Sequence, residues 1–327
     1  MKAVVTTTYG SPEVLELQEV AKPTPKADEV LVKIHAASVN AGDWHLMRAD
    51  PFLIRLGYGL RKPKIKILGA DVAGQVEAVG KDVTQFQQGD EIFGDISMCG
   101  FGAFAEYVAV PENVLVSKPA KLTFEQAAAV PEAAITALQG LRDYGQIRMG
   151  QKVLINGASG GVGTFAVQIA KSFGTEVTGV CSGGKMDLVR SIGADHVIDY
   201  TKEDFTQNGQ QYDLILAVGG YHPLADYKRA LSPRGTYVMT GGATKQMFQA
   251  MLLGPCLSMF GSQKMTGYLA KSNQKDLEVI SELLESSKLV PVIDRCYPLN
   301  EVPDAIRYLE SGKARGKVVI TMKQAET

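Results

Sequence analysis

The sequence predicts an α/β protein in which a doubly wound parallel sheet follows a β-rich domain. Three observations predict this. A strand-like segment, a glycine-rich loop and a helix-like segment follow one another between residues 151 and 173. Strand-like and helix-like segments then alternate for about a hundred residues, which is typical of parallel sheets. Before residue 125, short strand-like segments are separated by glycine and proline, as in an irregular antiparallel barrel.

The composition is that of an ordinary soluble protein large enough for two domains. The chain has 327 residues, of which 45% are hydrophobic and 21% charged, and its formal net charge is −1. This balance argues against nucleic acid or an anionic membrane as a partner. Four cysteines form no C-x-x-C pair, and the N-terminus lacks the apolar block of a signal peptide, so we expect a cytoplasmic protein. The apolar segment 250–261 is too short to insert into a membrane, and Gly254 and Pro255 should interrupt it.

The first 125 residues are expected to form the β-rich domain. Pro23 and Pro25 exclude helix from the turn AKPTPKAD, which separates the first two strand patterns. The expected strands are VLELQEV (14–20), EVLVKIHAASV (29–39), GADVAGQVEAVG (69–80), QQGDEIFG (87–94) and FAEYVAV (104–110). A helical stretch over 124–144 then leads into the second domain.

The segment QKVLINGASGGVG (151–163) is predicted to bind a phosphate group. Its glycines at Gly157, Gly160 and Gly163 allow a tight turn and a close approach of main-chain N–H groups to a pyrophosphate. The helix that follows adds unpaired N–H donors and the positive end of its dipole. Glycine-rich turns that bind nothing are common, so the string alone is weak. The alternation that follows it strengthens the prediction.

Strands and helices alternate after this loop. Strands are expected at 176–180, 196–200, 212–220 and 235–242, and helices at 185–192 and 224–231. Helices then cover both faces of a parallel sheet, and ligands bind beyond the carboxyl ends of its strands. The middle of the chain is therefore predicted to bind a dinucleotide.

The end of the second strand favours NADPH over NADH. An acidic side chain there would bind the adenosine ribose of NAD, whereas the 2′-phosphate of NADP needs room and positive charge. The chain reads VCSGGK at this point, so Ser182 can donate a hydrogen bond and Lys185 can supply the charge. The alternative is that Lys185 is a solvated residue in the first turn of a helix, where a cation is unfavourable.

Six motifs in order resemble the medium-chain dehydrogenase/reductase superfamily, in particular its zinc-free, quinone oxidoreductase-like members. They are VNAGDWHLMR (39–48), GADVAGQVEAVG (69–80), AEYVAVP (105–111), AAITALQGL (133–141), GASGGVG (157–163) and ARGKVVIT (314–321). The resemblance covers essentially the whole chain. It implies a discontinuous GroES-like catalytic domain, 1–125 and 262–327, a Rossmann cofactor domain, 126–261, and an active site in the cleft.

The residue types argue against zinc. Zinc-dependent relatives place a cysteine where this chain has Asn40, and a Gly-His-Glu string where it has Gly69, Ala70 and Asp71. The lobe with four cysteines is missing, and no H-x-x-x-H pair occurs among the four histidines. Without a Lewis acid, an alcohol or ketone oxygen is harder to polarise. Hydride transfer to a quinone or to a conjugated C=C bond is then favoured.

Three residues of NAGDWHLMR are the catalytic candidates. His45 stands where many relatives carry tyrosine and can donate a hydrogen bond or a proton near neutral pH. A helix-surface histidine with no chemical role is the equal alternative. Asn40 is expected to be a positioning donor, to substrate or cofactor. Asp43 is expected to be a structural hydrogen-bonding residue more than a catalyst.

The segment 51–68 is both apolar and basic. Its five cations are typical of a solvated loop face. The alternative is a lid hinged at Gly57 and Gly59, in which Phe52 and Tyr58 contact a large apolar electron acceptor. Binding of single-stranded nucleic acid remains a weak possibility.

Further cofactor contacts follow from the resemblance. Thr136 resembles the residue that meets the nicotinamide amide, Tyr200 one that stacks near the adenosine, and Lys317 a tail position close to the cofactor, although an exposed lysine is commoner there. The pyrophosphate loop is implied to be Ser159, Gly160, Gly161 and Val162, and the nicotinamide border Val218, Gly219, Gly241 and Gly242. The segment 262–268 matches an edge strand that relatives pair across a two-fold axis, so a homodimer is expected.

Three functions follow, in decreasing order of support. The first is an NADPH-dependent reductase of quinones or α,β-unsaturated carbonyls. The second is a metal-free NADP-dependent alcohol dehydrogenase or carbonyl reductase. The third is an NADPH-binding protein without catalytic activity.

Overall fold

The chain folds into two compact units in the computed structural model, which describes residues 1–242, 244–259 and 261–322, without the side chains of 255–257 and 259. The first unit consists of Met1–Glu132, Ser272–Glu285 and Pro291–Thr327. The second consists of Ala133–Lys271 and Ser286–Val290. The first unit is thus discontinuous, and its boundaries differ from the expected 125/126 and 261/262.

A parallel sheet forms the centre of the second unit. Its order among the described residues is β10-β9-β8-β11-β12-β13. The strands are β8 (Lys152–Asn156), β9 (Glu176–Cys181), β10 (His196–Asp199), β11 (Tyr212–Ala217), β12 (Leu231–Met239) and β13 (Lys264–Gly267). All five pairings are parallel, and β8 begins the sheet next to β11, where the strand order reverses. Ligands of such sheets bind at this reversal.

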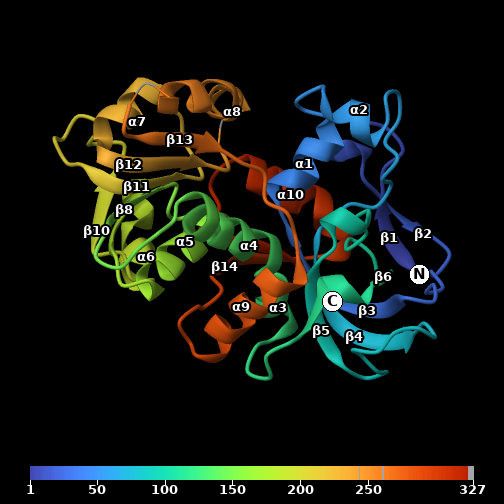
Figure 1. Cartoon of the computed structure of the whole chain (residues 1–327). Coiled ribbons are helices and arrows are strands. Elements are labelled where there is room, and N and C mark those ends of the chain that lie inside the picture. The colour runs from blue at the N-terminus through green and yellow to red at the C-terminus, as the bar shows by residue number, and fades with distance from the viewer. Residues whose placement is uncertain (243, 260, 323–327) are drawn as a thin grey trace. The chain divides into compact units, whose positions relative to one another are not determined.

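Helices cover both faces of this sheet, as right-handed crossovers require. Figure 1 shows α5 (Gly161–Ser172) and α6 (Met186–Ser191) on one face and α7 (Leu224–Ala230) and α8 (Thr244–Met259) on the other. Ala166 and Ile169 of α5 are fully buried, as their helical spacing predicts. The doubly wound fold is confirmed, and each strand and helix expected between 151 and 242 is present, with bounds shifted by a few residues.

Helix α8 differs from expectation. We expected Gly254 and Pro255 to interrupt the apolar segment 250–261, but α8 runs through both to Met259. Gly254 lies close to β13, where a Cβ would stand 2.6 Å from the Met265 carbonyl oxygen, so packing on the strand favours glycine there. Residue 260 of this segment lies outside the described residues. No described helix is long and apolar enough to cross a membrane.

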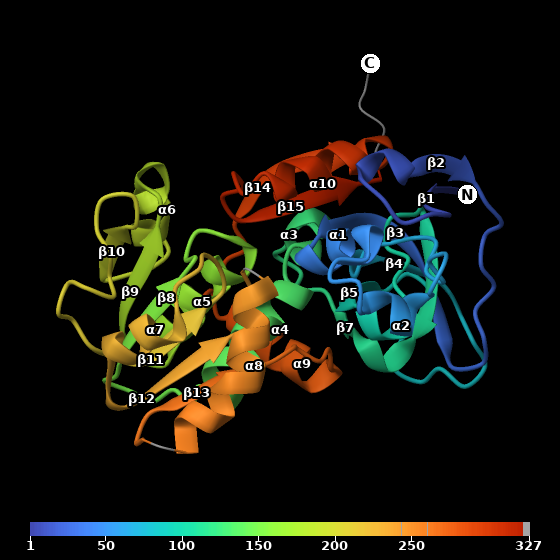
Figure 2. The same cartoon turned by 90° about the horizontal axis from the view of Figure 1, so that it is seen from above.

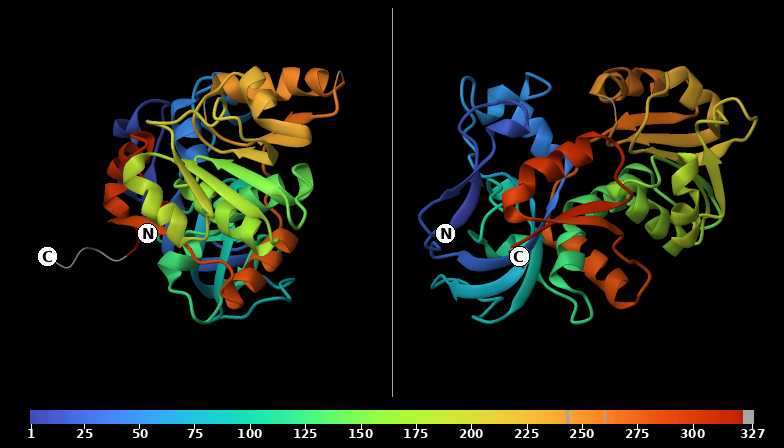
Figure 3. Two further views of the ribbon diagram at one scale, coloured as in Figure 1. Left: turned by 90° about the vertical axis from the view of Figure 1, so that its left-hand side faces the viewer. Right: turned by 180° about the vertical axis from the view of Figure 1, so that it is seen from behind.

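The first unit is built on a second sheet, ordered β14-β15-β3-β4-β5-β7, with β6 also paired to β3. The strands are β3 (Glu29–Val39), β4 (Asp71–Val79), β5 (Glu91–Asp95), β6 (Tyr107–Pro111), β7 (Leu115–Ser117), β14 (Ile293–Pro298) and β15 (Lys317–Thr321). A separate hairpin joins β1 (Lys2–Val5) and β2 (Glu16–Glu19). Figure 2, and the right-hand view of Figure 3, show the red C-terminal strands beside the blue N-terminal ones.

Short helices complete the first unit. The α-helices are α1 (Ala41–Arg48), α2 (Ile54–Tyr58), α3 (Phe124–Ala128), α9 (Gln274–Glu285) and α10 (Val302–Glu310). Single turns of 3₁₀-helix occur at Pro12–Val14, Ser97–Cys99, Glu112–Val114 and Leu299–Glu301. The core joins distant parts of the chain, since Val32 and Phe104 pack in one cluster with Ile306 and Val318.

Two contacts explain the shifted boundaries. Helix α3 packs on β3 and β4, so the chain belongs to the first unit as far as Glu132. Strand β13 pairs with β12, which places 262–271 in the second unit and not, as expected, in the catalytic domain. The helical stretch 124–144 is divided between α3 and α4 (Pro131–Gln139), because proline disfavours helix at the residue before it. A π-helical turn, Gly140–Tyr144, follows α4.

Candidate active site

The loop from Gly157 to Gly163 has the close backbone packing that the sequence predicts for a phosphate site. Gly157 has a φ of 92°, and a Cβ on it would lie 2.9 Å from the backbone nitrogen of Gly219. A Cβ on Gly163 would lie 2.1 Å from the Gly157 carbonyl oxygen. Side chains are therefore excluded at both positions, and the turn between β8 and α5 is as tight as a dinucleotide loop requires.

Backbone donors at the start of α5 are available to an anion. Gly160 is the N-cap residue, and the N–H groups of Gly161, Val162 and Gly163 have no carbonyl within the helix to bind. The neighbouring N–H groups of Gly157 and Ala158 are already used by the Val180 carbonyl. A dinucleotide pyrophosphate fits this donor set. The predicted role of Ser159, which is buried beside it, is untested.

Two further loops meet the glycine loop at the same sheet edge. Val218 follows β11 and donates its N–H to the Asn156 carbonyl at 2.9 Å, which places Gly219 against Gly157. A Cβ on Gly241 would lie 2.9 Å from the Val218 carbonyl oxygen, and one on Gly242 equally close to that of Gly220. The structure thus brings together the residues that we predicted for the pyrophosphate and the nicotinamide border.

The loop after β9 holds the residues predicted to select NADPH. Ser182 is the N-cap of a 3₁₀ turn, Gly183–Lys185, and Lys185 in turn precedes α6. Tyr200 is 60% exposed, and its N–H donates to the Cys181 carbonyl, so its ring is free to contact an adenosine. These three residues lie at the carboxyl ends of β9 and β10, and their predicted roles are untested.

Sequence reasoning missed Asp199 in this region. The parallel register pairs Asp199 with Cys181, and a Cβ on Gly183 would lie 2.6 Å from an Asp199 carboxylate oxygen. The hydroxyl of Thr201 donates to this carboxylate at 2.7 Å. This bond is the main reason that the pKa of Asp199 lies below its usual value. The sequence pattern indicates only the end of the second strand as the place for an acid, whereas the neighbouring strand supplies one.

A buried polar cluster forms where α1 begins in the first unit. Asn40 follows β3 as the N-cap of α1 and is 7% exposed, and Asp43 is fully buried. Asp43 accepts hydrogen bonds from the backbone N–H groups of Asn40, at 2.8 Å, and Gly69, at 2.9 Å. This geometry fits the structural role expected of Asp43. Burial raises its pKa to about 7, against the effect of those two bonds.

Asp71 is the hub of this cluster. It is fully buried at the start of β4. Its Oδ2 accepts from the hydroxyl of Ser38 at 2.6 Å and the amide of Asn40 at 2.9 Å. Its Oδ1 accepts from the backbone N–H of Glu132 at 2.8 Å. The sequence showed Asp71 only as a replacement within a zinc motif, and gave no sign of these partners.

Lys317 supplies the cluster with a cation. Its side chain is 2% exposed, and its ammonium lies 3.2 Å from Asp71 Oδ2 and donates to Asn40 Oδ1. Lys317 is therefore buried, unlike the exposed lysine that is common in such tails. The antiparallel pairing of β15 with β3 brings Lys317 to this position. Its predicted contact with the cofactor is untested.

Two more carboxyl groups adjoin Asp71. Asp95 ends β5 opposite Asp71 in the β4–β5 register, and Glu132 stands in the first turn of α4. Burial, reinforced by the charge of Asp71, raises the pKa of Asp95 to about 6. Burial, reinforced by Asp95, Asp71 and Asp43, raises the pKa of Glu132 well above its ordinary value. Neither residue was singled out from the sequence.

His45 and Thr136, the other polar candidates, have partners within their own units. The ring of His45 stacks on Trp44 with centroids 3.6 Å apart, and its Nδ1 lies 2.5 Å from the Asp50 carbonyl oxygen. One ring nitrogen of this partly exposed side chain is thus occupied. Thr136 is buried in α4, and its carbonyl accepts a hydrogen bond from the Tyr268 hydroxyl. Both predicted roles are untested.

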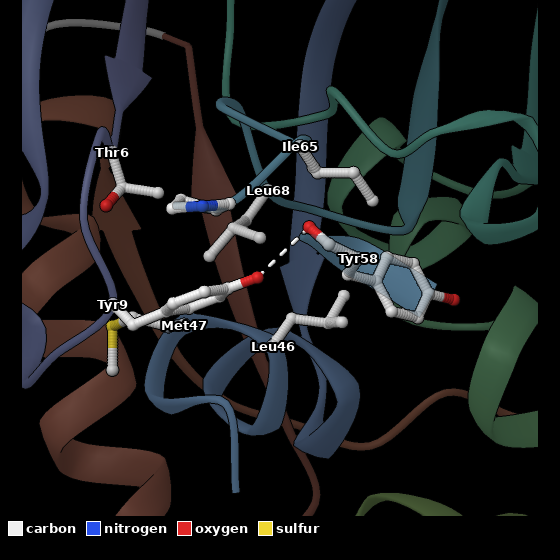
Figure 4. Close-up of a pocket in the computed structure, with 8 residues that line it drawn as sticks. Thr6, Tyr9, Leu46, Met47, Tyr58, Ile65 and Leu68 are labelled. Atoms are coloured by element: carbon white, nitrogen blue, oxygen red, sulfur yellow. Dashed lines mark hydrogen bonds between the residues drawn. The ribbon is translucent and has the colours of Figure 1, made fainter. Parts of the chain in front are cut away.

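The segment 51–68 exposes apolar as well as basic side chains. Phe52 is 62% exposed and Tyr58 is 39% exposed. Leu53, Leu56 and Leu60 are exposed as well. Figure 4 shows a small apolar pocket beneath this segment, where the Tyr9 hydroxyl points at the Tyr58 carbonyl and the Tyr58 ring turns away. Four of the five cations are exposed, as in a solvated loop face. The predicted contacts of Phe52 and Tyr58 with substrate are untested.

The donor set around Asn40 does not fit a catalytic zinc ion. Such a site needs Cys, His or carboxylate ligands that converge on an open position. Here an ammonium group, that of Lys317, lies against Asp71 and would repel a metal ion. The part of the chain that the structure describes contains no group of three His, Cys, Asp or Glu residues able to hold a metal. Catalysis without zinc stays a prediction.

Comparisons with known proteins agree with this architecture. Family models described as "Alcohol dehydrogenase GroES-like domain" and "Zinc-binding dehydrogenase" match residues 26–120 and 192–320. A 2-methylene-furan-3-one reductase of Solanum lycopersicum is 38% identical over 333 residues, which cover 98% of this chain and 79% of that one. An NADPH-dependent alkenal/one oxidoreductase, chloroplastic, of Arabidopsis thaliana is 34% identical, with coverage of 98% and 79%.

A solved structure extends the likeness to the whole fold. The quinone oxidoreductase from Coxiella burnetii superposes with a TM-score of 0.86 at 30% identity and covers 99% of both chains. The chain therefore belongs to the medium-chain dehydrogenase/reductase superfamily, in its quinone oxidoreductase-like branch.

Proposed function

We propose that the protein is an NADPH-dependent oxidoreductase that reduces a quinone or an α,β-unsaturated carbonyl compound without a metal. The observation that supports it most is the arrangement of three glycine loops at the reversal of the parallel sheet, with free N–H donors at the start of α5. Relatives named as a furanone reductase, an alkenal/one oxidoreductase and a quinone oxidoreductase support the substrate class.

Residues of the second unit would hold the cofactor. The N–H groups of Gly161, Val162 and Gly163 would bind the pyrophosphate, and Ser182 and Lys185 the 2′-phosphate. When bound, NADPH supplies the hydride. Asp199 adds a negative charge close to Gly183, and this charge opposes the binding of a 2′-phosphate. The preference for NADPH over NADH therefore depends on the positive charge of Lys185.

The chemistry of the first unit favours a conjugated substrate over a plain alcohol. Negative charge that develops on a carbonyl or quinone oxygen needs hydrogen-bond donors, each able to contribute roughly 3 kcal/mol in the transition state. A conjugated substrate spreads this charge and depends less on a metal ion. Asn40 is a positioned donor here, because both polar atoms of its amide are bonded within the cluster.

Steady-state oxidation of NADPH against separate panels of quinones, alkenals, enones and simple ketones tests the proposal. We expect turnover of quinones or alkenals at rates well above those of ketones, and the same rates after treatment with a chelator. Preferential turnover of ketones, or oxidation of alcohols with NADP⁺, would instead support a carbonyl reductase. Loss of activity on metal extraction would disprove the metal-free mechanism.

We also propose a homodimer and a cytoplasmic location, as expected from the sequence. Strand β13 is the edge of its sheet among the described residues, but the Met265 N–H there donates to the Ser258 hydroxyl of α8 at 2.9 Å. Strand pairing between two copies would have to displace this bond or begin beside it. Sedimentation equilibrium decides between monomer and dimer.

A further inference from the structure

The proposed reduction needs a proton as well as a hydride, and the carboxyl group of Glu132 differs from its acidic neighbours in being uncommitted. Asp43 and Asp71 each use both carboxylate oxygens to accept hydrogen bonds, and Asp95 accepts one from the Ser97 N–H at 2.8 Å. Among the described residues, no hydrogen-bond partner is found for the Glu132 carboxyl. A proton on this carboxyl is therefore not engaged in a hydrogen bond to another described residue.

The position of Glu132 is well defined and reaches the surface. Its backbone N–H donates to Asp71 at 2.8 Å, which fixes the first turn of α4 against β4. Its side chain extends towards the start of α1, where a Cβ on Gly42 would lie 3.7 Å from Oε1. The residue is partly exposed, unlike Asp43, Asp71 and Asp95. Glu132 therefore keeps some contact with solvent, whereas the other three are buried.

Burial and the surrounding charges favour the protonated form of Glu132. Negative groups face it from three elements, namely Asp43 on α1, Asp71 on β4 and Asp95 on β5. Lys317 on β15 is the cation that acts on it, but its ammonium is directed at Asp71 and Asn40. Burial and the three carboxyl groups raise the pKa of Glu132 well above its ordinary value. This shift favours the protonated form of Glu132, which is the form that a general acid must have.

We propose that Glu132 is the general acid of the reaction, a role that rests on the proposed function. Hydride from the cofactor forms a C–H bond at the β-carbon of a conjugated aldehyde, and the electrons of the C=C bond move towards the carbonyl oxygen. The O–H bond of Glu132 then breaks, and its proton forms the new bond at the α-carbon. The C=C bond becomes a single bond, the cofactor is oxidised, and the Glu132 carboxylate takes a proton from water.

Reduction of a quinone depends less on a positioned acid such as Glu132. Its reduction places the negative charge on oxygen, which water protonates rapidly, whereas protonation at carbon is slow without a positioned acid. The ratio of alkenal to quinone turnover therefore reports Glu132 specifically. A residue that only supports the fold would alter both activities together.

The test compares Glu132→Gln with wild type, using 2-hexenal and 1,4-benzoquinone as acceptors. We expect Glu132→Gln to lower kcat for 2-hexenal by at least about 100-fold, within the range of general acid catalysis. Quinone turnover and the Kd for NADPH should stay within about threefold. Glu132→Asp, which keeps an acid one methylene shorter, should recover part of the 2-hexenal activity. The pH profile of the wild type should fall at high pH, and the variant should lack that fall.

Glu125→Gln is the matched control, because Glu125 is a partly exposed glutamate of the same unit, on α3, and does not act on the cluster. Alkenal turnover of Glu132→Gln within twofold of wild type would overturn the role of Glu132. An equal loss of both activities would show a structural role instead and overturn it as well. Wild-type protein inactive with every acceptor would refute the proposed function itself, and this inference with it.

Discussion

Replacement of Lys317 by methionine should destabilise the first unit strongly. Methionine has a similar length but removes the ammonium from Asp71 and Asn40, whose side chains are at most 7% exposed. Loss of one partner from a buried ion pair costs about 3–5 kcal/mol. In a unit of this size, each kcal/mol lowers Tm by about 2–4 °C, so we expect a decrease of roughly 6–20 °C. Lys313→Met, at an exposed lysine four positions earlier, should leave Tm within about 1 °C.

The fluorescence of Trp44 is a suitable assay because the chain has one tryptophan. Trp44 lies in α1, next to Asp43, so its signal reports the first unit and not the second. Urea titrations should show a midpoint shift for Lys317→Met. Binding of NADPH, followed by its own fluorescence, should persist where the second unit stays folded.

The effect should also depend on pH. Asp43 and Asp95 have pKa values of about 7 and about 6, so both are largely protonated at pH 5 and ionised at pH 8. Removal of the cation therefore matters less at pH 5 than at pH 8. A Tm equal to that of wild type, or a decrease of the same size at both pH values, would refute the assignment of Lys317 as the cation of this cluster.

Three further predictions concern the cofactor loop, cofactor selection and pH. Gly157→Ala should weaken NADPH binding at least tenfold in a fluorescence titration, because its Cβ meets Gly219. Gly209→Ala, at a similar positive φ but with nothing within 4 Å, should leave binding unchanged; equal effects would exclude the clash as the cause. Lys185→Ala should raise the KM for NADPH about tenfold or more, with little effect on the KM for NADH, because the loss of a charge-assisted bond costs about 1.5–3 kcal/mol. Lys152→Ala, at an exposed lysine, is the control. An unchanged KM for NADPH in Lys185→Ala would exclude the predicted 2′-phosphate role of Lys185. For wild type, the raised pKa of Asp43 means that the unfolded state ionises first, near pH 4. The free energy of unfolding of the first unit should then fall between about pH 4 and pH 7, by up to roughly 4 kcal/mol for Asp43; urea midpoints that rise over this range would contradict it.

The sequence predicted the second unit well because its signals are local. The strand before Gly157, the glycine spacing and the helical pattern from Val162 to Phe173 all lie within one short segment. Each following strand and helix has its own periodicity. The edge strand was harder to place: β13 was expected in the catalytic domain but pairs with β12, and its four residues contain no sign of that partner strand.

The carboxyl cluster of the first unit could not be predicted in the same way. Its members come from β3, α1, β4, β5, α4 and β15, and they meet only through strand pairing between distant segments. Asp43 and Asn40 were found because a family resemblance pointed to their motif. Glu132 was missed because a single glutamate after proline resembles any residue in the first turn of a helix. Asp199 was missed because the sequence of neither strand indicates the register in which two parallel strands pair.

The late place of Lys317 in the chain has a consequence for biosynthesis. Asp71 leaves the ribosome 246 residues before the lysine that neutralises it. At about 5–20 residues per second, that interval lasts roughly 12–50 s. During this time the second unit emerges complete and can fold, while the nascent first unit still lacks strand β15. A chain that terminates prematurely before residue 317 is left with acidic groups that no cation ever reaches, and such fragments should be cleared by cellular proteases.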